Sequence, residues 1–180
     1  MNPLAIYTTA LFALTISLIV AGVFSLRLSS ENLARFEPIP RNRIAGGILT
    51  FIALLWCVPH TRPIIWTSWL PFLYPLVILC TVLAITYLDN LFSRALGGFM
   101  ILAAYYFLHA SFTFHSTGVI LFSLLCWGLG IVGIFFSGKP FLMRDLIRRC
   151  AASPGWRIGT AIYCFVFALS ALIAGFTHLT

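Results

Sequence analysis

The chain alternates between long apolar stretches and short loops that carry nearly all of its charge. Hydrophobic residues make up 61% of its 180 residues and charged residues only 8%, against about 45–50% and 25% in soluble domains. A water-soluble fold of this length cannot hide so much apolar surface, so the sequence predicts an all-α protein whose helices cross a lipid bilayer. We predict one polytopic domain over residues 1–180, with spans at 3–26, 44–59, 70–88, 96–114, 118–137 and 158–176.

The basic residues predict the orientation of these six spans. Ten of the eleven Lys and Arg residues fall in the loops after the first, third and fifth spans, and the exception is Arg62. Basic loops stay on the cytoplasmic side, so both termini are expected outside. The short loops, and a first span that no basic segment precedes, favour a bacterial cytoplasmic membrane. The net charge of +7 lies beside apolar spans, so anionic lipid headgroups are a more natural partner than nucleic acid.

Residues 140–152 form neither a span nor an ordinary loop. At 100° per residue the segment has one apolar arc and one charged arc, which is typical of a short amphipathic helix lying on the cytoplasmic surface. An ordinary basic loop is the alternative. The apolar arc holds Leu142, Met143, Leu146, Ile147 and Cys150, and the charged arc holds Arg144, Asp145, Arg148 and Arg149. Of these, Arg144, Arg148 and Arg149 are expected to contact lipid headgroups or a cytoplasmic partner.

The three cytoplasmic loops resemble one another. Each holds an acid with an arginine four or five residues later, and each returns to the membrane through a basic residue and a glycine. One interpretation is three helical hairpins about an axis along the membrane normal, as in some transporters. The other is that acids only offset the charge of basic stop signals, and the unequal loop lengths favour it. The candidate ion pairs are Glu31–Arg35, Asp89–Arg94 and Asp145–Arg149.

The predicted orientation places all four histidines on the outer side. Only His109 lies inside a span, where an ionisable residue is a candidate functional group. A haem, a metal ion or a quinone would need two histidines from different helices, and His109 with His178 is the first pair to consider. Alternatively, His109 hydrogen-bonds a neighbouring helix, and no cofactor is then implied. The other outer candidates are His60 and His115, together with Tyr105 and Tyr106 on the face of His109.

Small residues in the last two spans predict close helix contacts. Gly128, Gly130 and Gly133 spell G-x-G-x-x-G, but a dinucleotide site needs a strand before this motif, and here it lies within a membrane helix. Small residues let helices approach closely in lipid. Ala171 with Gly175, and Ser170 with Ala174, repeat the spacing in the sixth span. The contacts could lie within the bundle or with another chain.

The sequence predicts no set of residues arranged for catalysis. The predicted topology separates the histidines from the carboxylates, which disfavours a Ser-His-Asp arrangement. A small chain with short outer loops is best interpreted as a non-enzymatic accessory or scaffold subunit that binds other membrane subunits or further copies of itself. A small transporter or channel built from three hairpins is one alternative. A haem-, metal- or quinone-binding membrane protein is the other.

Overall fold

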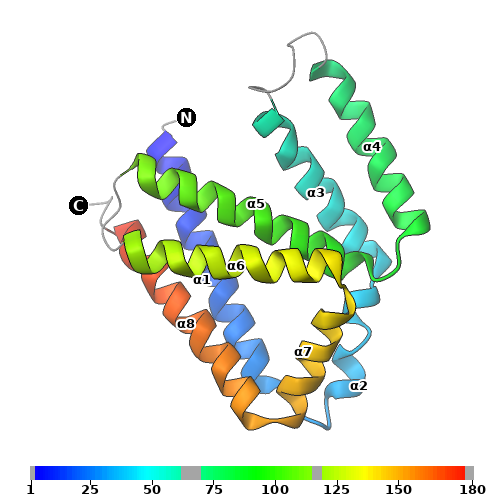
Figure 1. Ribbon diagram of the computed structural model, residues 1–180, viewed down its shortest axis with the longest axis vertical. Coiled ribbons are helices and arrows are strands. Elements are labelled where there is room, and N and C mark those ends of the chain that lie inside the picture. The colour runs from blue at the N-terminus through cyan, green and yellow to red at the C-terminus, as the bar shows by residue number, and fades with distance from the viewer. Residues whose placement is uncertain (1–2, 62–69, 115–118, 177–180) are drawn as a thin grey trace. The chain divides into compact units, whose positions relative to one another are not determined.

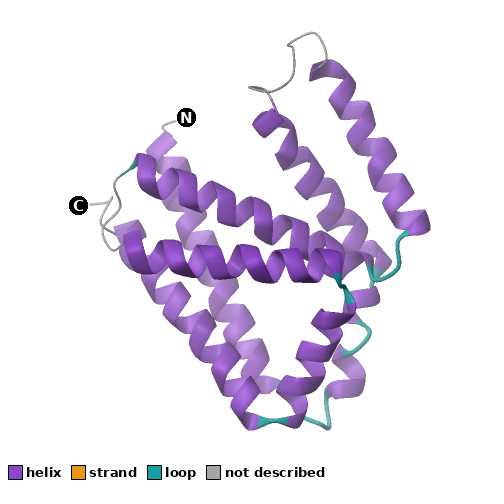
Figure 2. Cartoon of the chain, viewed as in Figure 1, coloured by secondary structure: helices purple, strands orange, loops and turns teal. Residues whose placement is uncertain are grey.

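The computed structural model describes residues 3–61, 70–114 and 119–176, and every regular element in those ranges is helical (Figure 2). Helices are the expected choice because they satisfy every backbone donor and acceptor within one apolar segment. Figure 1 labels them α1 (Pro3–Arg27), α2 (Leu33–Phe36), α3 (Arg43–Thr61), α4 (Leu70–Tyr87), α5 (Leu91–Thr113), α6 (Val119–Gly138), α7 (Phe141–Ala152) and α8 (Pro154–Phe176). A 3₁₀ helix, Ile39–Arg41, precedes α3.

Among the described helices, five are long and apolar enough to cross a membrane, namely α1, α3, α5, α6 and α8. The sixth apolar helix, α4, is shorter by this measure, with an apolar part over Pro71–Tyr87. The prediction of an all-α protein with several apolar membrane helices is therefore confirmed. Several hydroxyl groups within these helices donate to carbonyls of the preceding turn, as Thr15 does to Leu11 at 2.9 Å and Thr81 to Val77 at 2.7 Å, which satisfies these donors within their own helix.

Several helix ends differ from their predicted positions. The loop predicted over residues 89–95 is wrong, because α5 begins at Leu91, directly after Asn90 with its positive φ of 53°. Similarly, α8 begins at Pro154 rather than at residue 158, and α3 continues to Thr61, two residues beyond its predicted end. The predictions stopped each span where apolarity stopped. A helix continues past that point as long as its backbone hydrogen bonds continue. In α8 the first residue is Pro154, and proline suits the first turn of a helix.

The described helices form two compact units. Unit 1 comprises Met1–Phe36, Ala104–Leu129 and Asp145–Thr180, and unit 2 comprises Glu37–Ala103 and Gly130–Arg144. The helices α5 and α6 are each divided between the two units, with about half of each helix in either one. Neither unit is therefore a continuous stretch of sequence.

In unit 1 the main packing is between α1 and α8, the first and last helices (Figure 1). Buried residues on both follow a spacing of three and four, which is typical of helices that cross at a shallow angle. The buried face of α1 holds Tyr7, Leu11, Thr15, Leu18, Gly22 and Ser25, and that of α8 holds Ala161, Cys164, Ala168, Ala171 and Gly175. The small residues predicted to mark helix contacts in the sixth span thus lie within the chain.

In unit 2, α3 packs on α4, and the first half of α5 crosses the second half of α6. The α5–α6 crossing is very close, because a methyl group on Gly97 would lie 2.5 Å from the Gly133 carbonyl oxygen. A methyl group on Gly133 would lie 2.7 Å from the Gly97 carbonyl oxygen. Only hydrogen fits at either position. Gly133, which the sequence suggested as a contact residue, is therefore a point of backbone contact inside the chain.

Candidate functional site

Three arginines near the start of helices contact the end of a partner helix. In unit 1, Arg157 in the first turn of α8 donates from Nη1 to the Leu28 carbonyl oxygen at 3.0 Å. Leu28 follows α1 and is buried, so its carbonyl has little access to water. The last carbonyls of a helix lack intrahelical donors and carry partial negative charge. A guanidinium group therefore joins the end of α1 to the start of α8.

Unit 2 contains the same kind of contact between α5 and α6. Arg94 in the first turn of α5 donates from Nη1 to the carbonyl oxygen of Ser137 at 3.2 Å. One residue earlier, the Ser93 hydroxyl group is fully buried and lies 3.4 Å from the Phe136 carbonyl oxygen and 3.2 Å from that of Pro140. These bonds fix the start of α5 against the junction between α6 and α7.

The third contact, also in unit 2, is an ion pair between Arg43 at the start of α3 and Asp89 after α4, at 4.0 Å. The Asn42 side chain initiates α3 by accepting from the Ile44 and Ala45 amides at 3.0 and 3.1 Å, an N-cap. The two ionic side chains are 62% and 94% exposed, so water screens their attraction. We refer to Arg157–Leu28, Arg94–Ser137 and Arg43–Asp89 as the three arginine contacts.

These contacts differ from the ion pairs considered from sequence. Asp89 lies beside Arg43, while Arg94 donates to a backbone carbonyl. Arg149 places its guanidinium carbon 5.4 Å from the centre of the Trp156 ring, a cation–π contact between α7 and α8. Each of the remaining pairs, Glu31–Arg35 and Asp145–Arg149, stays a prediction. The arginine–carbonyl contacts were not predicted from the sequence. The signal that could have indicated them is the basic residue followed by a glycine with which each predicted cytoplasmic loop re-enters the membrane.

The predicted amphipathic segment is a helix, α7. Its apolar arc contains the two buried residues of the helix, Ile147 and Cys150, whereas Arg148 and Arg149 are exposed. The Cys150 thiol lies 3.5 Å from the Thr160 hydroxyl oxygen of α8. The buried arc thus packs within unit 1. The contact of the exposed arginines with lipid headgroups stays a prediction.

The second half of α5 carries an exposed strip of polar side chains. Tyr105 is 55% exposed, and His109, one turn later, is also exposed. Their ring centres lie 6.1 Å apart. Tyr106 is only half-buried, and Thr113 bonds back to the His109 carbonyl oxygen at 2.9 Å. We call Tyr105, His109 and Thr113 the α5 polar strip.

Two of the four candidate histidines, His60 and His109, lie within the described residues. His60 lies in the last turn of α3 with Nδ1 3.0 Å from the Trp56 carbonyl oxygen, so a local backbone contact orients its ring. The predicted partners His115 and His178 lie outside the described residues. Within residues 3–61, 70–114 and 119–176, no group of three or more metal-ligating side chains converges. Haem, metal and quinone binding stay predictions.

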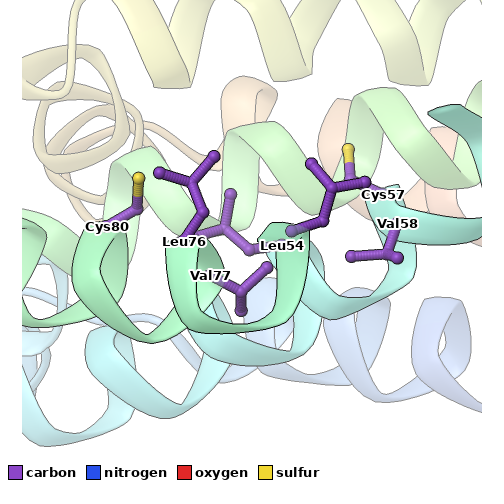
Figure 3. Close-up of a pocket in the computed structure, with 7 residues that line it drawn as sticks. Leu54, Cys57, Val58, Leu76, Val77 and Cys80 are labelled. Atoms are coloured by element: carbon purple, nitrogen blue, oxygen red, sulfur yellow. The ribbon is translucent and has the colours of Figure 1, made fainter. Parts of the chain in front are cut away.

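An apolar pocket of about 140 Å³ lies between α3 and α4. Figure 3 shows its side chains, with Cys57 and Cys80 toward opposite ends. Both cysteines are free thiols. The pocket is lined by Leu54, Cys57, Val58, Leu73, Leu76, Val77 and Cys80. The lining is apolar apart from these two thiols.

Comparisons with known proteins add no family to this picture. No family model matches the chain, and no curated protein and no solved structure gives a significant match.

Proposed function

We propose that this protein is a six-span subunit of the bacterial cytoplasmic membrane, with both termini outside, that acts as a non-enzymatic accessory or scaffold within a larger membrane assembly. The α5 polar strip is the observation that carries the proposal. His109 lies four residues before the end of α5, which is ~6 Å along the helix. A histidine and a tyrosine exposed at that depth are costly against lipid and are typical of surfaces that another helix covers.

Purification in a mild detergent tests this proposal. We expect the 20.0 kDa chain to elute with other polypeptides or further copies, as measured by light scattering and mass spectrometry. Replacing the strip by Tyr105→Phe with His109→Leu should release the partner, because the two polar groups that favour helix contact over lipid are removed. Tyr87→Phe, at an 81% exposed tyrosine in α4, is the matched control. A wild-type protein that elutes alone in every mild detergent would contradict the proposal.

The orientation is tested separately. Reporter groups at both termini should respond only to reagents added outside, and a cysteine placed at Lys139 should be reached only from the cytoplasm. The distribution of basic residues supports this arrangement. A terminus found in the cytoplasm would contradict it.

A small transporter is a second candidate, and the three arginine contacts favour it. They occur in three helix pairs, α1–α8, α5–α6 and α3–α4, which is the kind of internal repetition that transporters use. Reconstitution into planar bilayers tests this candidate. A conductance or solute flux that depends on the protein would support transport. Bilayers that contain correctly oriented protein and show no conductance or flux would contradict it.

A further inference from the structure

Four helix ends meet on one side of unit 1. The contact Arg157–Leu28 joins the start of α8 to the end of α1. The Phe24 ring near the end of α1 lies edge-on to the Phe36 ring of α2, with the ring centres 4.9 Å apart. The second half of α7 joins this group because Cys150 contacts the first part of α8. The end of α1, the short helix α2, the second half of α7 and the start of α8 therefore lie together.

The surface that these helix ends form carries mainly positive charge. The sequence of unit 1 contains five arginines and two acidic residues, Glu31 and Asp145. The start of α8 contributes Trp156, which is 50% exposed and lies under the guanidinium group of Arg149, with 5.4 Å between the guanidinium carbon and the ring centre. The basic surface of unit 1 comprises this tryptophan and the four exposed arginines Arg27, Arg35, Arg148 and Arg149.

The helices that carry the basic surface place it at the boundary of the apolar layer. Both α1 and α8 are long and apolar enough to cross a membrane, and the end of α1 at Arg27 lies beside the start of α8 at Pro154. Tryptophan is enriched at the depth of lipid headgroups, where its ring meets apolar groups and its N–H group meets water. Trp156 fits that depth, so the exposed arginines lie at the headgroup layer.

Charge complementarity indicates which headgroups the basic surface fits. Anionic phospholipids carry a net negative charge and zwitterionic ones carry none, so exposed guanidinium groups favour the anionic headgroups. Each guanidinium group can also donate to two oxygens of one phosphate. An acidic segment of a soluble protein would first have to displace the headgroups that already lie at this depth. The basic surface therefore fits lipid better than it fits a soluble protein.

We propose that the basic surface of unit 1 binds the headgroups of anionic phospholipids, and that the bound headgroups hold α2 and α7 against the ends of α1 and α8. Because the arginines are exposed and come from three different helices, the surface binds several lipids that exchange with the bilayer. The α5 polar strip takes no part in this binding, so the proposed partner of α5 and the lipid surface can fail separately.

Hydrogen exchange of the full-length protein in a neutral detergent tests the basic surface. Phosphatidylglycerol is titrated into the micelles, and the exchange of the backbone amides of α7 is followed by mass spectrometry. We expect phosphatidylglycerol to slow this exchange, phosphatidylcholine to have little effect, and high salt to reverse the protection because ions screen exposed charges. Equal protection by the two lipids, or protection that high salt leaves unchanged, would overturn the proposal.

Single substitutions on two different helices test whether one surface is involved. Arg149→Gln in α7 and Arg35→Gln in α2 should each raise the phosphatidylglycerol concentration for half-maximal protection of α7 by about fivefold, since each removes one cation. Arg41→Gln removes an exposed charge from unit 2 and should leave that concentration unchanged. An equal shift in Arg41→Gln would overturn the proposal by showing that total charge alone attracts the lipid.

Two further comparisons test the role of charge and the kind of partner. Arg149→Lys keeps the positive charge and should remain near wild type. A loss as large as that of Arg149→Gln would overturn the electrostatic account, because charge would then not be what the lipid recognises. Protection of α7 by soluble polyglutamate at a lower concentration than by phosphatidylglycerol would overturn the assignment to lipid and indicate an acidic protein segment.

Discussion

The α1–α8 pair and the α5–α6 pair both have an arginine that donates to a carbonyl at the end of the partner helix, yet they pack differently along their lengths. In α5–α6, Gly97 and Gly133 bring the two backbones together, and a methyl group at either position has no space. In α1–α8 the contact is made by side chains, and a methyl group on Gly175 would lie 3.7 Å from the Phe12 ring. Arginine contacts thus join the ends of both pairs, while residue size sets how closely the helices approach along their lengths.

The largest expected effect comes from the close crossing. Gly97→Ala should destabilise the protein by ~1–3 kcal/mol, because the added methyl group meets the backbone of α6 and cannot be accommodated by a side-chain movement. The measurement is the midpoint of unfolding in mixed detergent micelles, followed by tryptophan fluorescence. Gly98→Ala is the control, since a methyl group there meets nothing within 4 Å. Equal midpoints for the two variants would show that the α5–α6 crossing is looser than described.

The next effect concerns the end of the α1–α8 pair. Arg157→Gln should lower stability by ~1–2 kcal/mol, because it removes a charge-assisted bond to a largely buried carbonyl. Arg27→Gln, at an exposed residue in the last turn of α1, removes the same charge and should have little effect. Thermal unfolding of both variants in one detergent provides the comparison. A loss of equal size in Arg27→Gln would attribute the effect to loop charge rather than to the contact.

The smallest effect is expected for the exposed contact of α3 and α4. Arg43→Gln should change stability by about 0.5 kcal/mol or less, since the partners are 4.0 Å apart and largely exposed. High salt should remove what difference remains, because ions screen exposed pairs. A double-mutant cycle with Asp89→Asn measures the coupling directly. A coupling free energy above about 1 kcal/mol would show that this ion pair stabilises the protein as much as the other two arginine contacts do.

The fold was predictable where one physical property dominated. Apolarity located α1 to within one residue of its end, and the two arcs of residues 140–152 predicted α7. Apolarity could not locate the start of α5 at Leu91, because that turn is set by the Asn90 backbone and by Ser93, which bonds to residues more than forty positions later. Hydrophobic patterns report burial in lipid and contain no information on such distant polar partners.

The candidate sites were predictable to a smaller extent. Sequence alone identified Tyr105 and His109 as neighbours on one helix face, but their exposure depends on packing that single helices do not specify. The sequence placed the arginines near the ends of the apolar segments, yet nothing local distinguishes Arg94, whose guanidinium reaches Ser137 in another helix, from Arg41, which is exposed. Contacts between residues far apart in the chain decide such differences.

The pairing of α1 with α8 has a consequence for the synthesis of this protein. Helix α1 is synthesised long before its main neighbour α8, which begins only at Pro154. Until that helix emerges from the ribosome, the part of α1 around Gly22, which packs on Cys164 and Phe165 of α8, can be covered only by lipid or by insertion factors. Nascent chains that stop before Pro154 therefore display an incomplete helix surface, which a membrane protease could recognise.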